Sequence, residues 1–307
     1  MATSLTSPQL VFSGEKTIEA AHKAFVKTSV FTTDFTAIAA QPGSTLKVPI
    51  IAPGPAAQFD ASSNNYGDVD GALKFASVTF ANHVKETFAF TDTDFLEFHG
   101  AGIWSKAGAA AGTAITMAID TAVSGLINKT NIPKSGSPFS SKNESVLSSV
   151  TLAGVAALRE KAAKLGIDPA RTVLMFEPSY FSALVALLPA NTYGGADAIR
   201  NGVIPGLYGF KACIENSYLT DTAAEYLVGA LVPEDALVVA GRKVEVHSPR
   251  IYDEAGYTTD EDTGLTVTLR RFGKPETGEN FLSVEALFGA ALVQPEKCIR
   301  LVSQATA

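Results

Sequence analysis

The stretch Ile199–Ser217, IRNGVIPGLYGFKACIENS, concentrates glycine and proline among apolar residues just before an alternating segment. Glycine adopts positive φ and permits close backbone approach, and proline pre-sets a turn. We therefore predict a structural turn motif made of Gly202, Pro205, Gly206, Gly209 and Phe210. It leads into a buried strand whose inward face we expect to hold Phe210, Ala212 and Ile214. An ordinary tight turn in any α/β domain is the alternative for this pattern.

The segments around the motif alternate between helical and extended patterns. A helix is predicted from about Ser145 to Leu165, with Gly166 at its C-terminal cap. The run Thr172–Phe176 (TVLMF) predicts a short buried strand, and Pro178 then opens another helix in the favoured first-turn position. Further strands are predicted at Ala236–Ala240, Lys243–Ser248, Leu265–Arg271, Phe281–Gln294 and in the tail KCIRLV.

The first part of the chain reads as an arm followed by a long hairpin. Residues 1–40 contain one brief helical segment, TIEAAHKAF. Thr45–Ile51 alternates as a strand, and Pro49 fits an edge position. A loop of turn formers, Ala52–Ala72, separates it from a second extended run that begins at Leu73. Such a hairpin cannot bury both faces by itself, so we expect a neighbouring molecule to complete it.

One long helix is predicted over Ser105–Lys129. Ile115, Ile119 and Val123 form an apolar stripe at spacings of three and four. Gly108 and Gly112 each lower helix propensity by about 1 kcal/mol relative to alanine. Such small residues permit close approach of another backbone, so we expect a second segment to pack along this side.

Composition excludes some classes of protein. The chain has 307 residues, 46% of them hydrophobic, and can form a sizeable core. Its net charge of −7 argues against directly bound nucleic acid, which favours clustered Lys and Arg. Cys213 and Cys298 are expected to be buried free thiols of a reducing compartment. No signal peptide and no membrane span are apparent, so a protein of the cytoplasm is expected.

No constellation that could carry catalysis is found. The four histidines, at positions 22, 83, 99 and 247, show no metal-ligand spacing. Ser179 lacks the surrounding nucleophile elbow, and Asp68–Gly71 (DVDG) lacks the rest of a calcium loop. We therefore predict no catalytic, cofactor or metal site, and a protein that is not an enzyme.

The order of these segments resembles that of the major capsid proteins of tailed bacteriophages. The turn motif resembles the passage from helix to strand in that family's axial domain. Arg171–Leu187 is similar to the family's strand followed by a proline-led helix. Gly100–Ile127 looks like its spine helix, with Asp120 midway. The resemblance spans nearly the whole chain and implies an α+β, HK97-like fold.

The resemblance also implies a division of the chain. Residues 1–40 would be the N-terminal arm that lies over neighbouring subunits, and 41–92 the extended loop. Residues 93–145 and 246–293 would form the peripheral domain, with the spine helix at about 105–129. Residues 146–245 and 294–307 would form the axial domain.

By the same resemblance the chain is a virion protein that assembles in the host cytoplasm into pentamers and hexamers of an icosahedral shell. Implied partners are other copies of the chain, a separate scaffolding protein, a portal protein and packaged DNA bound without sequence specificity. As a hypothesis, acidic residues of the loop meet basic residues of an adjacent subunit. These candidates are Asp60, Asp68 and Asp70, with Arg242, Lys243, Arg250, Arg270 and Arg271.

Three alternatives remain open. An encapsulin-like compartment shares the fold but encloses enzymes rather than DNA. A soluble α/β hydrolytic enzyme would need a pocket with converging titratable groups. An adhesin or tube-forming structural protein would form tubes in place of closed shells.

Overall fold

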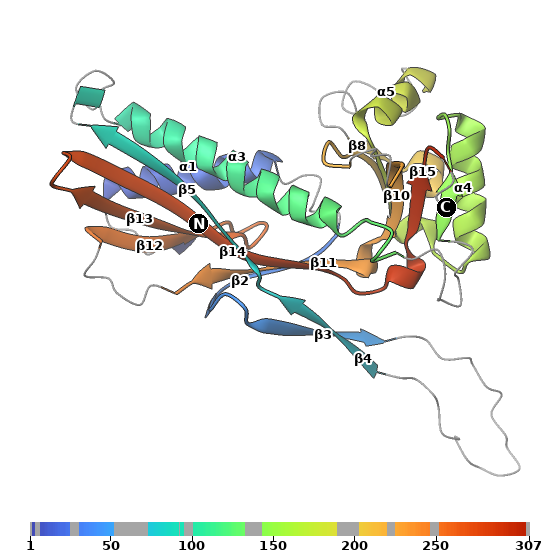
Figure 1. The fold of residues 1–307 in the computed structure, drawn as a ribbon, viewed down its shortest axis with the longest axis horizontal. Coiled ribbons are helices and arrows are strands. Elements are labelled where there is room, and N and C mark those ends of the chain that lie inside the picture. Colours follow the sequence, from blue (N-terminus) through green and yellow to red (C-terminus); the bar gives the residue numbers. More distant parts are fainter. Residues whose placement is uncertain are drawn as a thin grey trace, which may run out of the picture.

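The computed structural model describes residues 2–3, 7–24, 31–51, 73–91, 93–94, 101–132, 143–188, 203–219, 225–245 and 252–304. These residues form two β-sheets flanked by helices and a separate two-stranded ribbon. Figure 1 shows an elongated body that carries the larger sheet under α3, a second body with α4 and α5, and the ribbon that projects from the first. Mixed helix and sheet agrees with the predicted α+β class.

The larger sheet is built around one long strand. Its order is β1-β12-β13-β14-β11-β2, and β5 pairs with the other edge of β14. Along β14, pairing with β13 ends at Glu285, and pairing with β11 begins at Leu287. The strands are β1 (Ala2–Thr3), β2 (Thr32–Ala40), β5 (Asn82–Thr91), β11 (Leu237–Val244), β12 (Glu254–Thr259), β13 (Thr266–Lys274) and β14 (Glu279–Leu292).

Two helices pack together over this sheet. The predicted long helix is α3 (Ala101–Gly125), and its stripe Ile115, Ile119 and Val123 is buried as expected. A helix of 17 residues, α1 (Pro8–Ala24), lies against it, where the sequence predicted only a brief one. The absence of a Cβ at Gly108 and Gly112 leaves room for backbone oxygens of α1. The predicted close approach of another backbone is therefore confirmed.

The second sheet is buried on both faces. Its order is β6-β15-β10-β7-β9-β8. Helices α4 (Leu152–Lys164) and α5 (Pro178–Leu187) contribute to the apolar core on one face, and α3 contributes to the core on the other. Its strands are β6 (Glu144–Val146), β7 (Thr172–Phe176), β8 (Val203–Pro205), β9 (Ala212–Glu215), β10 (Leu227–Pro233) and β15 (Ile299–Val302). Short 3-10 turns lie at Pro169–Arg171, Leu207–Gly209, Glu234–Ala236 and Pro295–Lys297.

The helix predicted from Ser145 begins later, at Leu152. Thr151 caps its first turn because the Thr151 hydroxyl accepts a hydrogen bond from the Gly154 N–H at 3.0 Å. The residues before the cap form β6, which pairs parallel with β15. The predicted C-terminal cap is confirmed, since Gly166 has φ of 71°.

The strands predicted at Ala236–Ala240 and Lys243–Ser248 form one strand, β11, whose end lies at Val244. It pairs with β14 and with β2, so it belongs to the seven-stranded sheet. The predicted axial range 146–245 includes this strand, whereas the hydrogen bonding places it in one sheet with β12, β13 and β14, which fall in the predicted peripheral range. The elements described within residues 1–40, which are β1, α1 and β2, likewise pack within their own subunit. That this segment also covers a neighbour stays a prediction.

The ribbon consists of β3 (Thr45–Ile51) and β4 (Leu73–Thr79), paired antiparallel. Val78 and Phe80 fix its base in a small apolar cluster with residues of β11 and β14. Gly289 of β14 leaves room for the Thr79 carbonyl at the end of β4, where these two strands approach each other. Pro49 lies in the edge strand β3, as predicted. The predicted loop Ala52–Ala72 lies outside the described residues.

Candidate assembly surfaces

The turn motif forms a compact bend before β9. Gly206, Tyr208 and Gly209 all have positive φ, at 69°, 50° and 79°. Glycine adopts this region freely, whereas a tyrosine there is uncommon. Pro205 ends β8, and Phe210 is almost completely buried beside the turn. The predicted structural role of these residues is consistent with the geometry, and Gly202 lies outside the described residues.

The strand after the turn has no exposed face, which differs from the prediction. Ala212 and Ile214 pack in the core shared with α3. Phe210 packs instead with Cys213 in the core under α4 and α5. The prediction of one inward face failed because β9 lies inside a sheet covered on both sides, where period-two alternation separates two cores and not core from solvent.

A buried polar contact joins the two bodies of the molecule. Asn216 follows β9, and its Nδ2 donates to the Ser124 hydroxyl of α3 at 2.8 Å. The Asn216 Oδ1 accepts from the Tyr218 N–H at 2.9 Å. Sequence reasoning noted Asn216 only as part of a family pattern and missed Ser124, since the two are 92 residues apart.

An ionic cluster lies beside the turn. Glu234 accepts hydrogen bonds from Lys211 at 2.5 Å and from Arg171 at 2.7 Å. The hydrogen bond donated by Lys211 lowers the pKa of the Glu234 carboxyl, and the bond that Arg171 donates to Glu234 raises the pKa of Arg171. The cluster joins the residue just before β9 to the 3-10 turn before β7 and to the 3-10 turn after β10. The sequence alone did not predict this cluster.

The predicted basic contact residues are engaged within their own subunit. Arg242 is buried and stacks 5.4 Å from the Phe80 ring centre, and Lys243 lies 4.3 Å from the ring centre of Tyr257. On β13, Arg270 lies 3.0 Å from Glu285, and Arg271 donates to Gln9 of α1 at 2.9 Å. Asp60, Asp68, Asp70 and Arg250 lie outside the described residues. Their pairing across subunits stays a prediction.

The ribbon has one packed face and one exposed face. Leu46, Val48 and Val78 point toward the body and pack on it at least partly. On the outer face Phe75 is 60% exposed, opposite Pro49. The outer face also carries the exposed residues Thr45, Lys47, Ser77 and Thr79.

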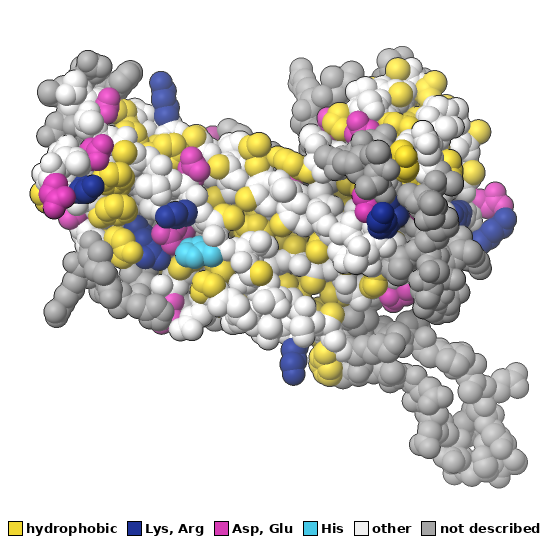
Figure 2. All heavy atoms as spheres, viewed as in Figure 1, with side chains coloured by type: hydrophobic (Ala, Val, Ile, Leu, Met, Phe, Trp, Pro, Cys, Tyr) yellow, Lys and Arg dark blue, Asp and Glu magenta, His cyan; other side chains and the backbone are white. Residues whose placement is uncertain are grey.

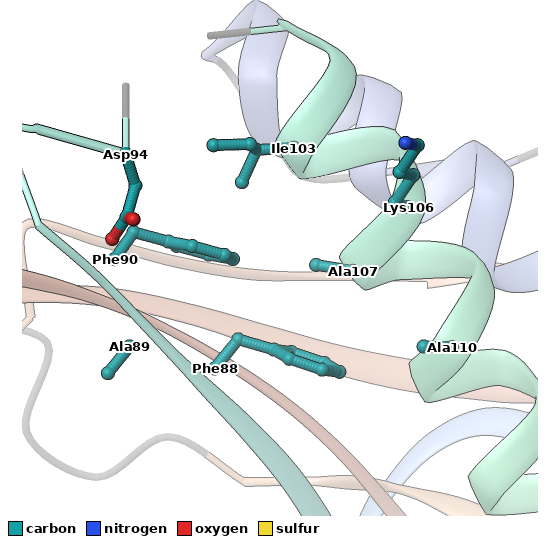
Figure 3. A pocket seen from close by; sticks show the side chains of 8 residues that line it. All are labelled: Phe88, Ala89, Phe90, Asp94, Ile103, Lys106, Ala107 and Ala110. Atoms are coloured by element: carbon teal, nitrogen blue, oxygen red, sulfur yellow. The ribbon is translucent and has the colours of Figure 1, made fainter. Parts of the chain in front are cut away.

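A groove of about 470 Å³ lies between β5 and the first half of α3. Phe88 and Phe90 point toward Ile103, Ala107 and Ala110 across it, as Figure 3 shows. Asp94 and Lys106 complete its lining. The Asp94 carboxylate accepts hydrogen bonds from the Thr91 N–H and hydroxyl, both at 2.8 Å. The first of these lowers the pKa of Asp94, so this carboxylate is ionised at neutral pH.

The face shown in Figure 2 carries most of its charged side chains toward its two ends. From Ala107 to Asn128 the only charged residue in the sequence is Asp120. Most of this range belongs to α3, where Met117 is an exposed large apolar side chain. A surface poor in charge is favourable for burial against another protein.

The described residues offer neither a metal site nor a membrane-spanning helix. In the described ranges no three His, Cys, Asp or Glu side chains come together as a metal site would require. No helix in the part of the chain that the structure describes is long and apolar enough to cross a membrane. Cys213 and Cys298 are free and buried, and burial raises the pKa of both thiols far above the ordinary value.

Three solved structures share this arrangement. A capsid structure of the cyanophage P-SCSP1u matches with a TM-score of 0.55 and 14% identity, over 91% of this chain and 87% of that one. The mature capsid of bacteriophage PhiM1 matches with a TM-score of 0.52 and 12% identity, over 88% of this chain and 85% of that one. A virus-like particle from Pyrococcus furiosus matches with a TM-score of 0.52 and 13% identity, over 94% of this chain and 97% of that one. At these identities the likeness shows the fold, which is the predicted HK97-like one.

No curated protein matches the sequence significantly. A family model described as phage capsid protein matches residues 79–301. That range includes β5, α3, the turn motif and most strands of both sheets, and it covers well over half of the chain. The chain therefore belongs to the phage capsid protein family and is a structural subunit of a capsid.

Proposed function

We propose that this subunit forms the pentamers and hexamers of an icosahedral phage head that encloses double-stranded DNA. The observation that best supports this is the ribbon β3–β4, which packs on the body along one face and exposes Phe75 on the other. A two-stranded ribbon is marginally stable by itself. It gains stability by covering another copy, and closed rings let every ribbon find such a neighbour.

The proposed partners follow from the same account. Within residues 1–40, α1 and β2 form part of the subunit core, so neither serves as an internal scaffold. We propose a separate scaffolding protein, a portal protein and assembly in the host cytoplasm. The net charge of −7 suits a container whose wall holds DNA without binding its sequence. The ionic pairs of the described residues serve the fold, and we propose no enzymatic activity.

Electron microscopy of purified particles tests the proposal. The chain is expressed alone and together with the scaffolding protein of the same phage, and particles are also purified from infected cells. Closed shells with fivefold and sixfold rings are expected, and those from infected cells should contain nuclease-protected DNA. Shells that hold a protein cargo and no DNA would indicate an encapsulin-like compartment, and open tubes would contradict an icosahedral head.

A further inference from the structure

The two sheets are joined by connectors that run side by side. Glu234–Ala236 links β10 to β11, and Pro295–Lys297 links β14 to β15, each as a single 3-10 turn. The Ala236 carbonyl accepts hydrogen bonds from the Val293 N–H at 2.8 Å and from the Gln294 N–H at 3.4 Å. Hinge motions take place in short irregular segments at the ends of strands and helices. Because both connectors cross at the same place, the two bodies can tilt relative to each other there.

A carboxylate also ties the end of α3 to the smaller sheet. The Glu225 Oε2 atom accepts a hydrogen bond from the N–H of Lys129, just after α3, at 3.0 Å. The same oxygen accepts a bond from Arg300 of β15 at 2.6 Å, and the Glu225 carbonyl accepts another at 3.0 Å. Arg300 is almost completely buried, whereas the Glu225 side chain is 24% exposed and its bond to Lys129 lies at the surface. Water can therefore replace the bond to Lys129 at little cost, while the bonds to Arg300 stay.

The residue next to Glu225 has an unusual backbone conformation. Tyr226 has φ of 49°, and Tyr208, with 50°, is the other non-glycine residue with positive φ in the part of the chain that the structure describes. An L-residue in this region is strained and persists only where its surroundings hold it. At Tyr226 they do so from both sides, because Arg300 binds Glu225 and the Tyr226 carbonyl accepts from the Ser303 N–H at 2.8 Å. Strain is therefore stored directly beside the contact that joins the two bodies.

One contact between the bodies is suited to stay closed during a tilt. The buried Ser124–Asn216 pair lies between α3 and the end of β9. A cavity of about 10 Å³ lies beside it, lined by Asp120 of α3 on one side and by Met175 and Tyr218 on the other. A small cavity and a flexible methionine leave room for neighbouring side chains to adjust. The pair can therefore serve as the fixed point about which the second body tilts.

We propose that Glu225 and Tyr226 form a latch that sets the angle between the two bodies. With the bond to the Lys129 N–H closed, the bodies keep the angle of this structure. With the bond open, Tyr226 relaxes and the second body tilts about the Ser124–Asn216 pair. Identical chains meet their neighbours at different angles in rings of five and of six, and the latch lets one chain take both angles. This inference rests on the proposed rings and names the element within the subunit that adapts to them.

Electron cryo-microscopy of the closed shell tests the latch directly, because it resolves the subunits of the two ring types separately. The bond between the Lys129 N–H and the Glu225 carboxylate is expected in one ring type. In the other, the two groups should lie more than about 4 Å apart. The Ser124–Asn216 bond is expected in both. The same Lys129–Glu225 distance in both ring types, or a lost Ser124–Asn216 bond in either, would overturn the inference.

Glycine variants give a second test with a matched control. Tyr226→Gly removes the strain, so the closed latch is favoured and the proportion of shells with the parent diameter should fall at least about twofold. Tyr208→Gly relieves the same kind of strain in the turn before β9 and should leave the shell diameter unchanged. Circular dichroism of the unassembled subunits checks that both variants fold. Equal diameters for the parent and both variants would contradict the latch.

The outcomes separate the latch from the proposed function. Shells of fivefold and sixfold rings whose subunits share one angle between the bodies overturn the latch and leave the capsid function standing. Shells made of fivefold rings alone would also overturn it, since one angle would then suffice. If the chain forms no closed particle under any condition, the proposed function itself fails.

Discussion

Ser124 of α3 and Asn216 after β9 share a buried hydrogen bond of 2.8 Å that connects the larger sheet's helix to the smaller sheet. The Ser124 hydroxyl also lies 2.8 Å from the Asp120 carbonyl, and Asn216 Nδ2 lies 3.8 Å from the Met175 sulfur. Both partners are almost fully buried. The pair therefore fixes how the two bodies meet.

The Ser124–Asn216 pair predicts coupled losses of stability. Asn216→Ala leaves the part-buried Tyr218 N–H without its acceptor, and the Ser124 hydroxyl keeps only its bond to the Asp120 carbonyl, so the change should cost about 1–2 kcal/mol of unfolding free energy. Ser124→Ala should cost about 1 kcal/mol. A double-mutant cycle by denaturant unfolding of the subunit should give a coupling of about 1 kcal/mol, and strict additivity would contradict the contact.

The contact between α1 and α3 predicts a sharp size limit. At Gly112 an added Cβ would collide with the Thr17 carbonyl, so Gly112→Ala should cost about 2–3 kcal/mol despite better helix propensity. Gly102 of the same helix faces open space, so Gly102→Ala should stabilise by up to about 1 kcal/mol. Thermal unfolding of both variants decides this, and equal effects would mean that the helices do not approach so closely.

In the ion pair of the buried Arg300 with Glu225, loss of the glutamate charge should lower stability more than loss of the arginine. Arg300 is 1% exposed and lies 2.6 Å from Glu225 and 3.6 Å from Glu144. Glu225→Gln leaves the guanidinium with a weakened partner in the interior and should cost about 3 kcal/mol. Arg300→Met leaves Glu225 without its arginine, but Glu225 is partly exposed to solvent, so this change should cost less unfolding free energy. Denaturant unfolding checks the order, and the reverse order would show that the pair contributes mainly through its charge attraction.

The Glu234 cluster predicts a dependence on pH. The hydrogen bond from Lys211 lowers the folded-state pKa of Glu234, so its contribution is present above the ordinary glutamate pKa, about 4.3. That contribution is lost as pH falls through the lower folded value. Glu234→Gln should therefore cost about 0.5–1 kcal/mol at pH 7 and almost nothing near pH 2–3.

Measured across this range, the difference between the parent chain and Glu234→Gln should also shrink in high salt, because Arg171 and Lys211 are both considerably exposed. A difference that stays constant from pH 7 to pH 2 would show that the carboxylate charge is not responsible.

The sequence predicted elements whose pattern is local. Thr172–Phe176 and the helix opened by Pro178 appear where they were expected. The largely apolar run TVLMF and a first-turn proline are both visible in the local sequence. The spine helix starts four residues early and ends at Gly125. The Thr151 cap was also present in the sequence, although the helix was predicted to begin before it.

Elements defined by distant pairing could not be read in this way. β6 has three residues, and its strand conformation depends on β15, about 155 residues further along the chain. The full length of α1 depends on the small residues of α3 that receive it. The groove at Phe88 and Phe90 requires the placement of α3 over β5, and no local pattern predicts that placement.

Sedimentation velocity of the purified chain across a range of concentrations tests most directly whether the subunit is completed by copies of itself. The account predicts that rising concentration, with the scaffolding protein present, converts slow subunits and rings into one sharp boundary of shell-sized particles. A single slow monomer boundary at every concentration, with Phe75 still open to solvent, would contradict it.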